Sequence, residues 1–359
     1  CFEYHPKLNF FQIVESVTKP NQDALLVKEE FGNGSLFAVF DGHGSYGHLC
    51  ADFAKQKLPE FWERNLMRST MGKEEACKRA HVDCNKAMHR DTRAPDESSG
   101  TTAVSVLIQE NELLISNVGD SRAIIGRPYR VTIVDAKGMN QQVYDKERLN
   151  AKGIFREGNK NGTQSSNFDL DQTFSESASE TSEDASVELG FENWVERLEP
   201  LAALPLSNDQ TPYRSDEFTR ILNHRGATIM TSSQKKGRQA ALHEHNGEPL
   251  RVWAEYGFFP GTAFTRSLGD AVAERFGVCA EPELQRMPLH DAGRILVLAS
   301  DGVFQFMSNQ RVIDVCAACG DPWEACKKLL EASADEWKRH EERMDDVSMI
   351  VLFLSDKAC

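Results

Sequence analysis

The chain has 359 residues, of which 40% are hydrophobic and 27% are charged, a composition typical of a globular protein. Its 41 basic and 55 acidic residues give a formal net charge of −14, which disfavours binding to nucleic acid or to anionic membrane surfaces. No run of about 18 apolar residues occurs, so the sequence predicts no transmembrane helix.

The first third of the chain alternates apolar strands with two amphipathic helices. Phe10 to Val14 and Leu36 to Phe40 have the pattern of strands. Residues 46–67 and 73–90 have helical spacing, with a break expected near Pro59. Three more strands are predicted next: Thr101 to Ile108, Leu113 to Asn117 and Ala123 to Ile125. The polar turns between these three favour an antiparallel meander.

A long segment in the middle, from about 131 to 203, has a different composition. Between Thr163 and Gly190 there are seven acidic residues, seven serines and no basic residue. Such a stretch buries too little apolar surface to offset its ordering entropy, which predicts a loop. It is either a phosphorylated regulatory element or, as we favour, a solvated insertion. Phe191, Trp194, Val195 and Leu198 then have helical spacing and predict a short docking helix.

The last part of the chain returns to regular elements. Ile295 to Ala299 and Val347 to Leu354 are predicted strands, and residues 309–318 and 322–340 are predicted helices. Strands dominate, with helices in pairs between them. The order of elements indicates an α+β protein with stacked sheets covered by helices.

Nine cysteines occur, an odd number without the clustering of a disulfide-stabilised domain. We expect mostly reduced thiols and an intracellular protein, in the cytoplasm, the nucleus or both. The chain begins with Cys1 rather than Met, which indicates a processed or trimmed product. Cys316 and Cys319 form a C-x-x-C pair, but no second pair of zinc ligands follows, so ordinary helix residues are the better interpretation.

Aspartates stand at the ends of predicted strands at five places: Asp23, Asp41, Asp120, Asp301 and Asp345. Taken singly, each would be a turn or cap residue. Together they indicate one site, because crowded carboxylates resist ionisation unless a cation neutralises them. Oxygen ligands alone favour magnesium or manganese over zinc. A calcium-binding structural protein is disfavoured, because the EF-hand ligand spacing is missing.

Nine segments, in order along nearly the whole chain, resemble motifs of the protein phosphatase 2C family of metal-dependent serine/threonine phosphatases. They are NQD at 21–23, FAVFDGHG at 37–44, SGTTAV at 99–104, NVGDSRA at 117–123, LSNDQTP at 206–212, TRSLGD at 265–270, VCAEPE at 278–283, LASDGVF at 298–304 and DDVSMIVLF at 345–353. So many ordered matches are far more specific than any one motif.

The resemblance implies a central antiparallel β-sandwich flanked by α-helices on both faces, a four-layer αββα arrangement. It also implies one catalytic domain over residues 1–359, interrupted by the acidic insertion at about 131–203. The segment from Ser215 to Ile229 is similar to the helix and turn that precede a flap beside the family's active site.

By the same resemblance, two Mg²⁺ or Mn²⁺ ions bind at one end of the sandwich. Asp41 would bridge both ions and the Gly42 carbonyl would bind the second. Asp301 and Asp345, rather than Asp346, would complete the first, and Asp23 would hold metal-bound waters. The implied reaction is hydrolysis of phosphoserine and phosphothreonine in phosphorylated protein substrates, by attack of a metal-bridging hydroxide. His43 would protonate the leaving oxygen as general acid, rather than serve as a simple turn residue.

Two departures from the family pattern concern phosphate and a third metal. The usual phosphate-binding arginine is replaced by Thr18, and the neighbouring Lys19 offers only a point charge. A weak third metal would use Asp120, but its expected second aspartate is Gln305. Asp270 is interpreted as a structural hydrogen-bond acceptor. These departures leave a second hypothesis, a catalytically weak pseudophosphatase that acts as a regulatory binding module, ranked below the active enzyme because the core aspartates are present.

Overall fold

The computed structural model describes residues 2–5, 10–15, 21–67, 71–128, 131–134, 140–143, 201–237, 248–289 and 293–354. Side chains are described within 21–128 and 201–354, with the same gaps. The chain divides into two compact units. The first combines Cys1–Pro128 with Leu201–Cys359, and the second is Tyr129–Pro200.

The first unit contains two large sheets in which all neighbouring strands are antiparallel. In order across the six-stranded sheet the strands are β1 (Phe2–His5), β2 (Phe10–Glu15), β19 (Val347–Phe353), β18 (Ile295–Ala299), β9 (Arg122–Pro128) and β12 (Leu201–Pro205). The five-stranded sheet has β17 (Glu283–Pro288), β8 (Glu112–Val118), β7 (Ala103–Gln109), β4 (Gly34–Phe40) and β3 (Ala24–Phe31).

The two sheets pack face to face through an apolar core. Alternate residues of each strand point into it, as the two-residue period of a strand requires. Its fully buried members include, from β4, β7, β18 and β19, Phe37, Val39, Val104, Val106, Leu296, Leu298, Ile350 and Leu352. This core fixes the sandwich predicted from the sequence.

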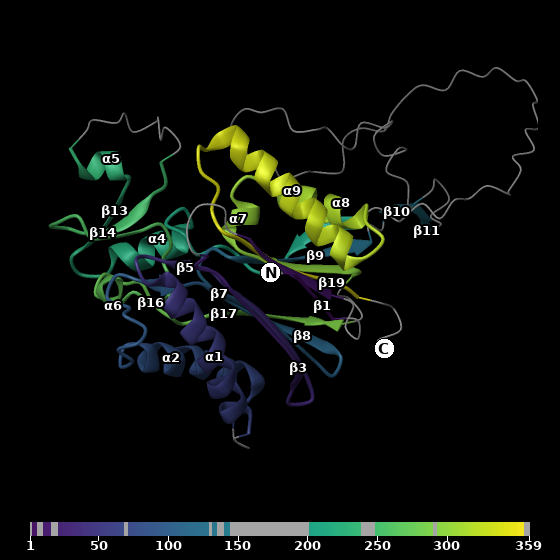
Figure 1. Cartoon of the computed structure of the whole chain (residues 1–359), viewed down its shortest axis with the longest axis horizontal. Helices are drawn as coiled ribbons and strands as arrows, with labels where there is room; N and C mark the ends of the chain where they lie inside the picture. Colours follow the sequence, from purple (N-terminus) through teal and green to yellow (C-terminus); the bar gives the residue numbers. More distant parts are fainter. Residues whose placement is uncertain are drawn as a thin grey trace, which may run out of the picture. The chain divides into compact units, whose positions relative to one another are not determined.

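Helices cover both outer faces of the sandwich, one pair on each side (Figure 1). Helices α1 (Gly47–Leu66) and α2 (Lys73–Met88) pack on the five-stranded sheet, where Trp62 is completely buried. Helices α8 (Asn309–Ala317) and α9 (Pro322–His340) pack on the six-stranded sheet. The molecule is therefore an α+β protein with the four layers that the sequence predicted.

Shorter elements gather at one end of the sandwich. Strands β13 (Ala227–Met230), β14 (Arg251–Ala254) and β15 (Pro260–Thr262) form a small sheet next to α4 (Ser215–Leu222) and α5 (Ser232–Lys235). Strands β5 (Gly42–His43), β6 (Gly100–Thr101) and β16 (Leu268–Gly269) form another. The one-turn helices α6 (Ala271–Glu274) and α7 (Asp301–Phe304) complete the set.

Two local predictions were wrong. The break expected near Pro59 is missing, because α1 runs unbroken through it from Gly47 to Leu66. Leu58 and Trp62 on either side are buried against the sheet, and this packing outweighs the lost backbone hydrogen bond.

The predicted meander is the second correction, because only β7 and β8 pair with each other while β9 joins the other sheet, between β18 and β12. Ile124 of β9 is buried under α8 and Ile125 is buried between the sheets. A strand buried on both faces has no alternation that would reveal its neighbours.

The second unit contains one described hairpin, β10 (Val131–Val134) paired with β11 (Asn140–Val143). Residues 201–203, which the sequence analysis assigns to the insertion, are the first residues of β12. The Ser/Glu tract and the predicted docking helix at 191–198 lie outside the described residues.

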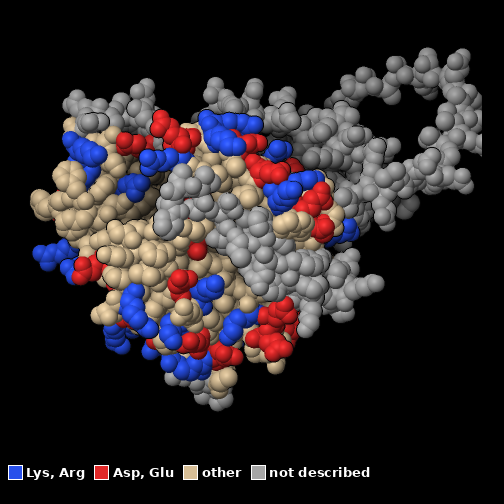
Figure 2. Space-filling model, in the orientation of Figure 1, with Lys and Arg blue, Asp and Glu red and all other residues tan. Residues whose placement is uncertain are grey.

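The surface carries mixed charge on the face shown in Figure 2, where basic and acidic side chains alternate over α9. There Lys328 pairs with Glu324, and Lys338 pairs with Asp335. Within the part of the chain that is described, none of the helices has the length and apolar character to cross a membrane.

Candidate active site

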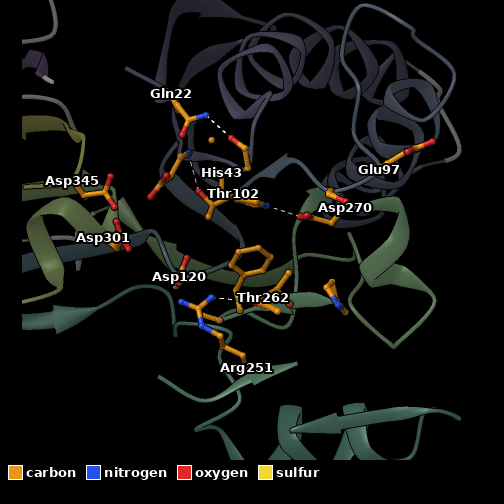
Figure 3. Close-up of a pocket in the computed structure, with 18 residues that line it drawn as sticks. Gln22, His43, Glu97, Thr102, Asp120, Arg251, Thr262, Asp270, Asp301 and Asp345 are labelled. Atoms are coloured by element: carbon orange, nitrogen blue, oxygen red, sulfur yellow. Dashed lines mark hydrogen bonds and ion pairs between the residues drawn. The ribbon is translucent and has the colours of Figure 1, made fainter. Parts of the chain in front are cut away.

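Strand ends from both sheets converge on one pocket of about 430 Å³. Asp41 follows β4 and Asp301 follows β18, while Asp345 and Asp120 shortly precede β19 and β9. Strands β18 and β19 are antiparallel neighbours, with Ala299 opposite Met349, so one end of that pair presents two of these carboxylates. All four aspartates line the pocket, as Figure 3 shows for Asp120, Asp301 and Asp345.

The backbone around Asp41 is fixed by its neighbours. Its N–H donates to the Thr102 hydroxyl at 3.0 Å, and its carbonyl accepts from the Thr102 N–H at 2.9 Å. The next residue, Gly42, also lines the pocket. A Cβ on Gly42 would lie 2.4 Å from the carbonyl oxygens of Gln22 and Gly47, so only glycine fits.

Asp23 lies opposite Asp41 across the β3–β4 pair, because Ala24 pairs with Phe40. It does not line the pocket. Both of its carboxylate oxygens are buried, and neither has a hydrogen-bond partner of good geometry among the described residues. Burial, then the charge of Asp346, raises its pKa to about 7, against a smaller opposing effect of the Ser348 and Ser300 hydroxyls. Buried carboxylate oxygens without such a partner are suited to bind water molecules that bridge to a nearby cation.

The carboxylates that line the pocket are crowded and poorly compensated. Burial raises the pKa of Asp41 well above its usual range, and the charges of Asp23, Asp301, Asp120 and Asp345 raise it further. Burial likewise raises the pKa of Asp301, with Asp120 and Asp345 adding to the effect. Such a cluster of oxygen donors, held close together so that their charges repel, fits hard divalent cations.

Asp345 and Asp346 are consecutive but take different places. Asp345 lines the pocket, whereas Asp346 is buried with 4% of its surface exposed and accepts a 2.9 Å hydrogen bond from the Gln22 N–H. Asp345, the ligand inferred from the sequence, thus lies at the pocket, whereas Asp346 bonds to the backbone of Gln22. Gln305, the departure near the third metal position, is exposed at the end of α7 and does not line the pocket.

His43 forms a close pair with Asp270, whose Oδ2 lies 2.6 Å from the imidazole Nε2. Burial lowers the pKa of His43, but the charge and hydrogen bond of Asp270 outweigh this and raise the pKa above its usual value. The ring also lies 4.3 Å from the Phe264 ring, centre to centre. Asp270 therefore both orients the His43 ring and favours its protonated form.

The backbone around Asp270 constrains the position of the His43–Asp270 pair. Its φ of 54° is in the left-handed region, and its N–H donates to the Ser99 carbonyl at 2.9 Å. A Cβ on Gly100 would approach the Asp270 carboxylate to 2.3 Å, so glycine is required there too. Asp270 is thus a hydrogen-bond acceptor, with His43 as its partner.

Comparison with known proteins agrees with this geometry. A family model described as Protein phosphatase 2C matches residues 14–166 and 201–339. The chain belongs to the protein phosphatase 2C family. The probable protein phosphatase 2C 35 of Arabidopsis thaliana is 31% identical over 350 residues, which cover 94% of this chain and 80% of that protein. The probable protein phosphatase 2C 64 of Oryza sativa subsp. japonica is 28% identical over 351 residues, covering 94% of this chain and 63% of the relative.

Solved structures share the fold. A serine-threonine phosphatase 2C from Toxoplasma gondii aligns with a TM-score of 0.64 at 13% identity, over 96% of this chain and 94% of that one. A sex determining protein from C. elegans aligns with a TM-score of 0.59 at 16% identity, over 97% and 64% of the two chains. The phosphatase 2C described here is thus, by family, a serine/threonine protein phosphatase and a metal-dependent hydrolase.

Another acidic cluster of this phosphatase 2C has a different character. Asp216, Glu217 and Glu283 bring carboxylate oxygens within 4.8 Å of one another. Arginines neutralise them, since Arg220 and Arg266 bond Glu217 at 2.6 and 2.7 Å and Arg214 bonds Glu283 at 2.7 Å. This cluster is an ion-pair network that joins α4 to the strands.

Sequence reasoning did not find every residue that lines the pocket. Arg251, Glu97 and Phe264 line it without belonging to any motif that was singled out for chemistry. No local pattern marks them, because an arginine, a glutamate and a phenylalanine outside the matched motifs are ordinary residues until the fold brings them to the pocket. Thr18 and Lys19, the positions considered for phosphate binding, lie outside the described residues.

Proposed function

We propose that this phosphatase 2C is catalytically active and hydrolyses phosphoserine and phosphothreonine in proteins with the help of two bound Mg²⁺ or Mn²⁺ ions. The observation that carries the proposal is the convergence of Asp41, Asp301 and Asp345 beside the His43–Asp270 pair in one pocket. A pseudophosphatase would have no need to keep these carboxylates crowded together, because their mutual repulsion destabilises the metal-free fold.

The residues have distinct roles in this proposal. Asp41, the Gly42 carbonyl, Asp301 and Asp345 hold the two cations, with Asp23 orienting their waters and Asp120 available to a weak third ion. When bound, the cations lower the pKa of a shared water and neutralise the phosphoryl oxygens. Thr102 keeps Asp41 in place through its two hydrogen bonds.

His43 supplies the proton that the leaving seryl or threonyl oxygen requires. Asp270 accepts a hydrogen bond from Nε2 and raises the pKa of the ring, which favours the imidazolium, and the other ring nitrogen, Nδ1, would donate the proton. Phe264 packs against the ring and limits its rotation. The pair therefore combines orientation and charge, as a general acid needs.

The test is release of phosphate from a phosphothreonine peptide with Mn²⁺, Mg²⁺ or EDTA. Asp301→Asn is expected to lower the rate at least about 100-fold, since it removes a charge that acts on the transition state. Asp335→Asn is the matched control, because Asp335 is an exposed residue of α9 that pairs with Lys338. Absence of release by folded wild-type protein with either metal would favour the pseudophosphatase.

A further inference from the structure

Acidic and basic side chains are unevenly distributed around the pocket. Its lining contains six carboxylates, and among its described residues the only lysine or arginine is Arg251. The carboxylates come from the end of the sandwich and the adjoining loops, whereas Arg251 begins β14 of the small sheet. Figure 3 shows the Arg251 side chain extending into the pocket on the side of Asp120 and Thr262. Two divalent cations would neutralise four of the six charges, so a phosphate dianion still gains from a further positive group.

The position of Arg251 is set by the hairpin that carries it. Its Nη1 donates a 2.6 Å hydrogen bond to the Gly261 carbonyl on the neighbouring strand β15. Gly261 has a φ of +80°, and a Cβ there would lie 2.8 Å from the Trp253 ring. Trp253 in turn donates from Nε1 to the Met230 carbonyl at 2.9 Å. The hairpin therefore has little freedom to place the guanidinium elsewhere.

The rest of the guanidinium is available to a ligand. Among the described residues, the guanidinium makes one hydrogen bond, from Nη1 to the Gly261 carbonyl. No described carboxylate lies within 4.0 Å of the guanidinium as an ion-pair partner. Arg251 is half-buried and lines a pocket full of carboxylates, yet it is anchored to a carbonyl oxygen. Its remaining N–H groups form the planar fork that matches two oxygens of a phosphoryl group.

We propose that Arg251 binds the phosphoryl group of the substrate, and the phosphate product, from the side of the pocket that the β14–β15 hairpin forms. The inference rests on the proposed function and goes further, because it assigns phosphate affinity to a residue of the β14–β15 hairpin. In this arrangement the hairpin controls how strongly the phosphorylated side chain is held. Arg251 contributes mainly to binding and less to the chemical step, since its charge acts on the phosphoryl oxygens before and after transfer.

The experiment measures inorganic phosphate binding by titration calorimetry, with saturating Mg²⁺, alongside KM and kcat for a phosphothreonine peptide. Arg251→Gln keeps a donor for the Gly261 carbonyl but removes the charge. It is expected to weaken phosphate binding and to raise KM about 10- to 100-fold, with a smaller change in kcat. Arg251→Lys should recover part of the affinity. Arg225→Ala, at an exposed position between α4 and β13, is the control and should match wild type.

Phosphate binding by Arg251→Gln within about twofold of wild type would overturn the inference and leave the arginine a structural role in the hairpin. If Arg251→Gln does not fold, Arg251→Lys decides, because unchanged phosphate affinity in that variant would count against a bidentate fork. Phosphate binding that depends on Arg251 in a protein without turnover would refute the proposed function while supporting this inference. Normal turnover together with phosphate binding that does not depend on Arg251 would support the proposed function and refute this inference.

Discussion

Two carboxylate clusters of similar size differ in the charges that surround them. The pocket aspartates, defined as Asp41, Asp120, Asp301 and Asp345, crowd together with little internal compensation. The arginine-paired cluster, defined as Asp216, Glu217 and Glu283, has its counterions supplied by the chain. In the first, burial and the charges of neighbouring carboxylates raise the pKa values of Asp41 and Asp301. In the second, burial raises the pKa of Glu217, but Arg220, Arg266 and Thr265 outweigh it and bring it to about 2.

This difference indicates which cluster stabilises the fold and which one is suited to bind a ligand. A carboxylate whose partner is an arginine of the same chain contributes to the fold and leaves no charge for a ligand. A carboxylate whose partners are other carboxylates weakens the metal-free fold and gains from any cation that binds. The same substitution, acid to amide, should therefore have opposite effects on stability in the two clusters.

The largest effect on stability is expected for Glu217→Gln. Glu217 is 1% exposed, and its oxygens accept bonds from Arg220, Arg266 and Thr265. Arg220 would lose its carboxylate partner and Arg266 would keep only the longer 3.5 Å contact to Glu283, which should lower the free energy of unfolding by about 3 to 5 kcal/mol. Urea denaturation measures this. Asp216→Asn is the control, since its side chain is 62% exposed and should change stability much less. Equal losses in the two variants would contradict the comparison.

Asp301→Asn is expected to act in the opposite direction. In EDTA the variant should unfold at a temperature equal to or above that of wild type, because one charge of the repelling cluster is gone. Mn²⁺ at 100 times its dissociation constant should stabilise wild type by about 2.7 kcal/mol and the variant far less. Thermal unfolding with and without Mn²⁺ gives both values. The same Mn²⁺ shift in both proteins would exclude Asp301 as a ligand.

Asp270→Asn tests a carboxylate whose partner is His43, the general acid that we propose. The amide cannot stabilise the His43 imidazolium, so kcat for a phosphothreonine peptide should fall about 10- to 100-fold. With an aryl phosphate, whose leaving group needs little protonation, the loss should be much smaller. Comparison of kcat for the two substrates measures the difference. Equal losses would show that Asp270 serves the fold or the metals rather than the proton.

The smallest effect concerns His89, whose ring lies 2.5 Å from Asp96 and 3.2 Å from Glu274. The hydrogen bonds to Asp96 and then Glu274 raise its pKa to about 10, despite partial burial. Because the folded value exceeds the unfolded one, this contribution is complete below about pH 6.5 and is lost as the pH rises through 10. Its side chain is 24% exposed, so we expect about 1 kcal/mol.

His89→Gln should therefore destabilise the protein most near pH 6 and least above pH 10, as measured by denaturation across that range. A difference in stability that stays constant with pH would show that packing, rather than charge, is what the histidine contributes.

Much of the secondary structure could be predicted from local pattern. The strand from Ile295 to Ala299 and the helix over 322–340 are found at the predicted residues. Both have strong periodicity and sharp ends, which depend only on neighbours in the sequence. The placement of β9 could not be predicted, because a strand buried on both faces carries no sign of its partners. The continuous α1 through Pro59 depends on the sheet beneath it.

The sequence by itself determined the family and the aspartates at strand ends, because motifs and turn residues are properties of short segments. Only the tertiary structure decided which charges compensate one another. His43 and Asp270 are 227 residues apart, and Arg251 enters the pocket from a hairpin with no recognised motif. Electrostatic interactions act over a few ångströms of space, and the distance along the chain between two charges says nothing about that separation.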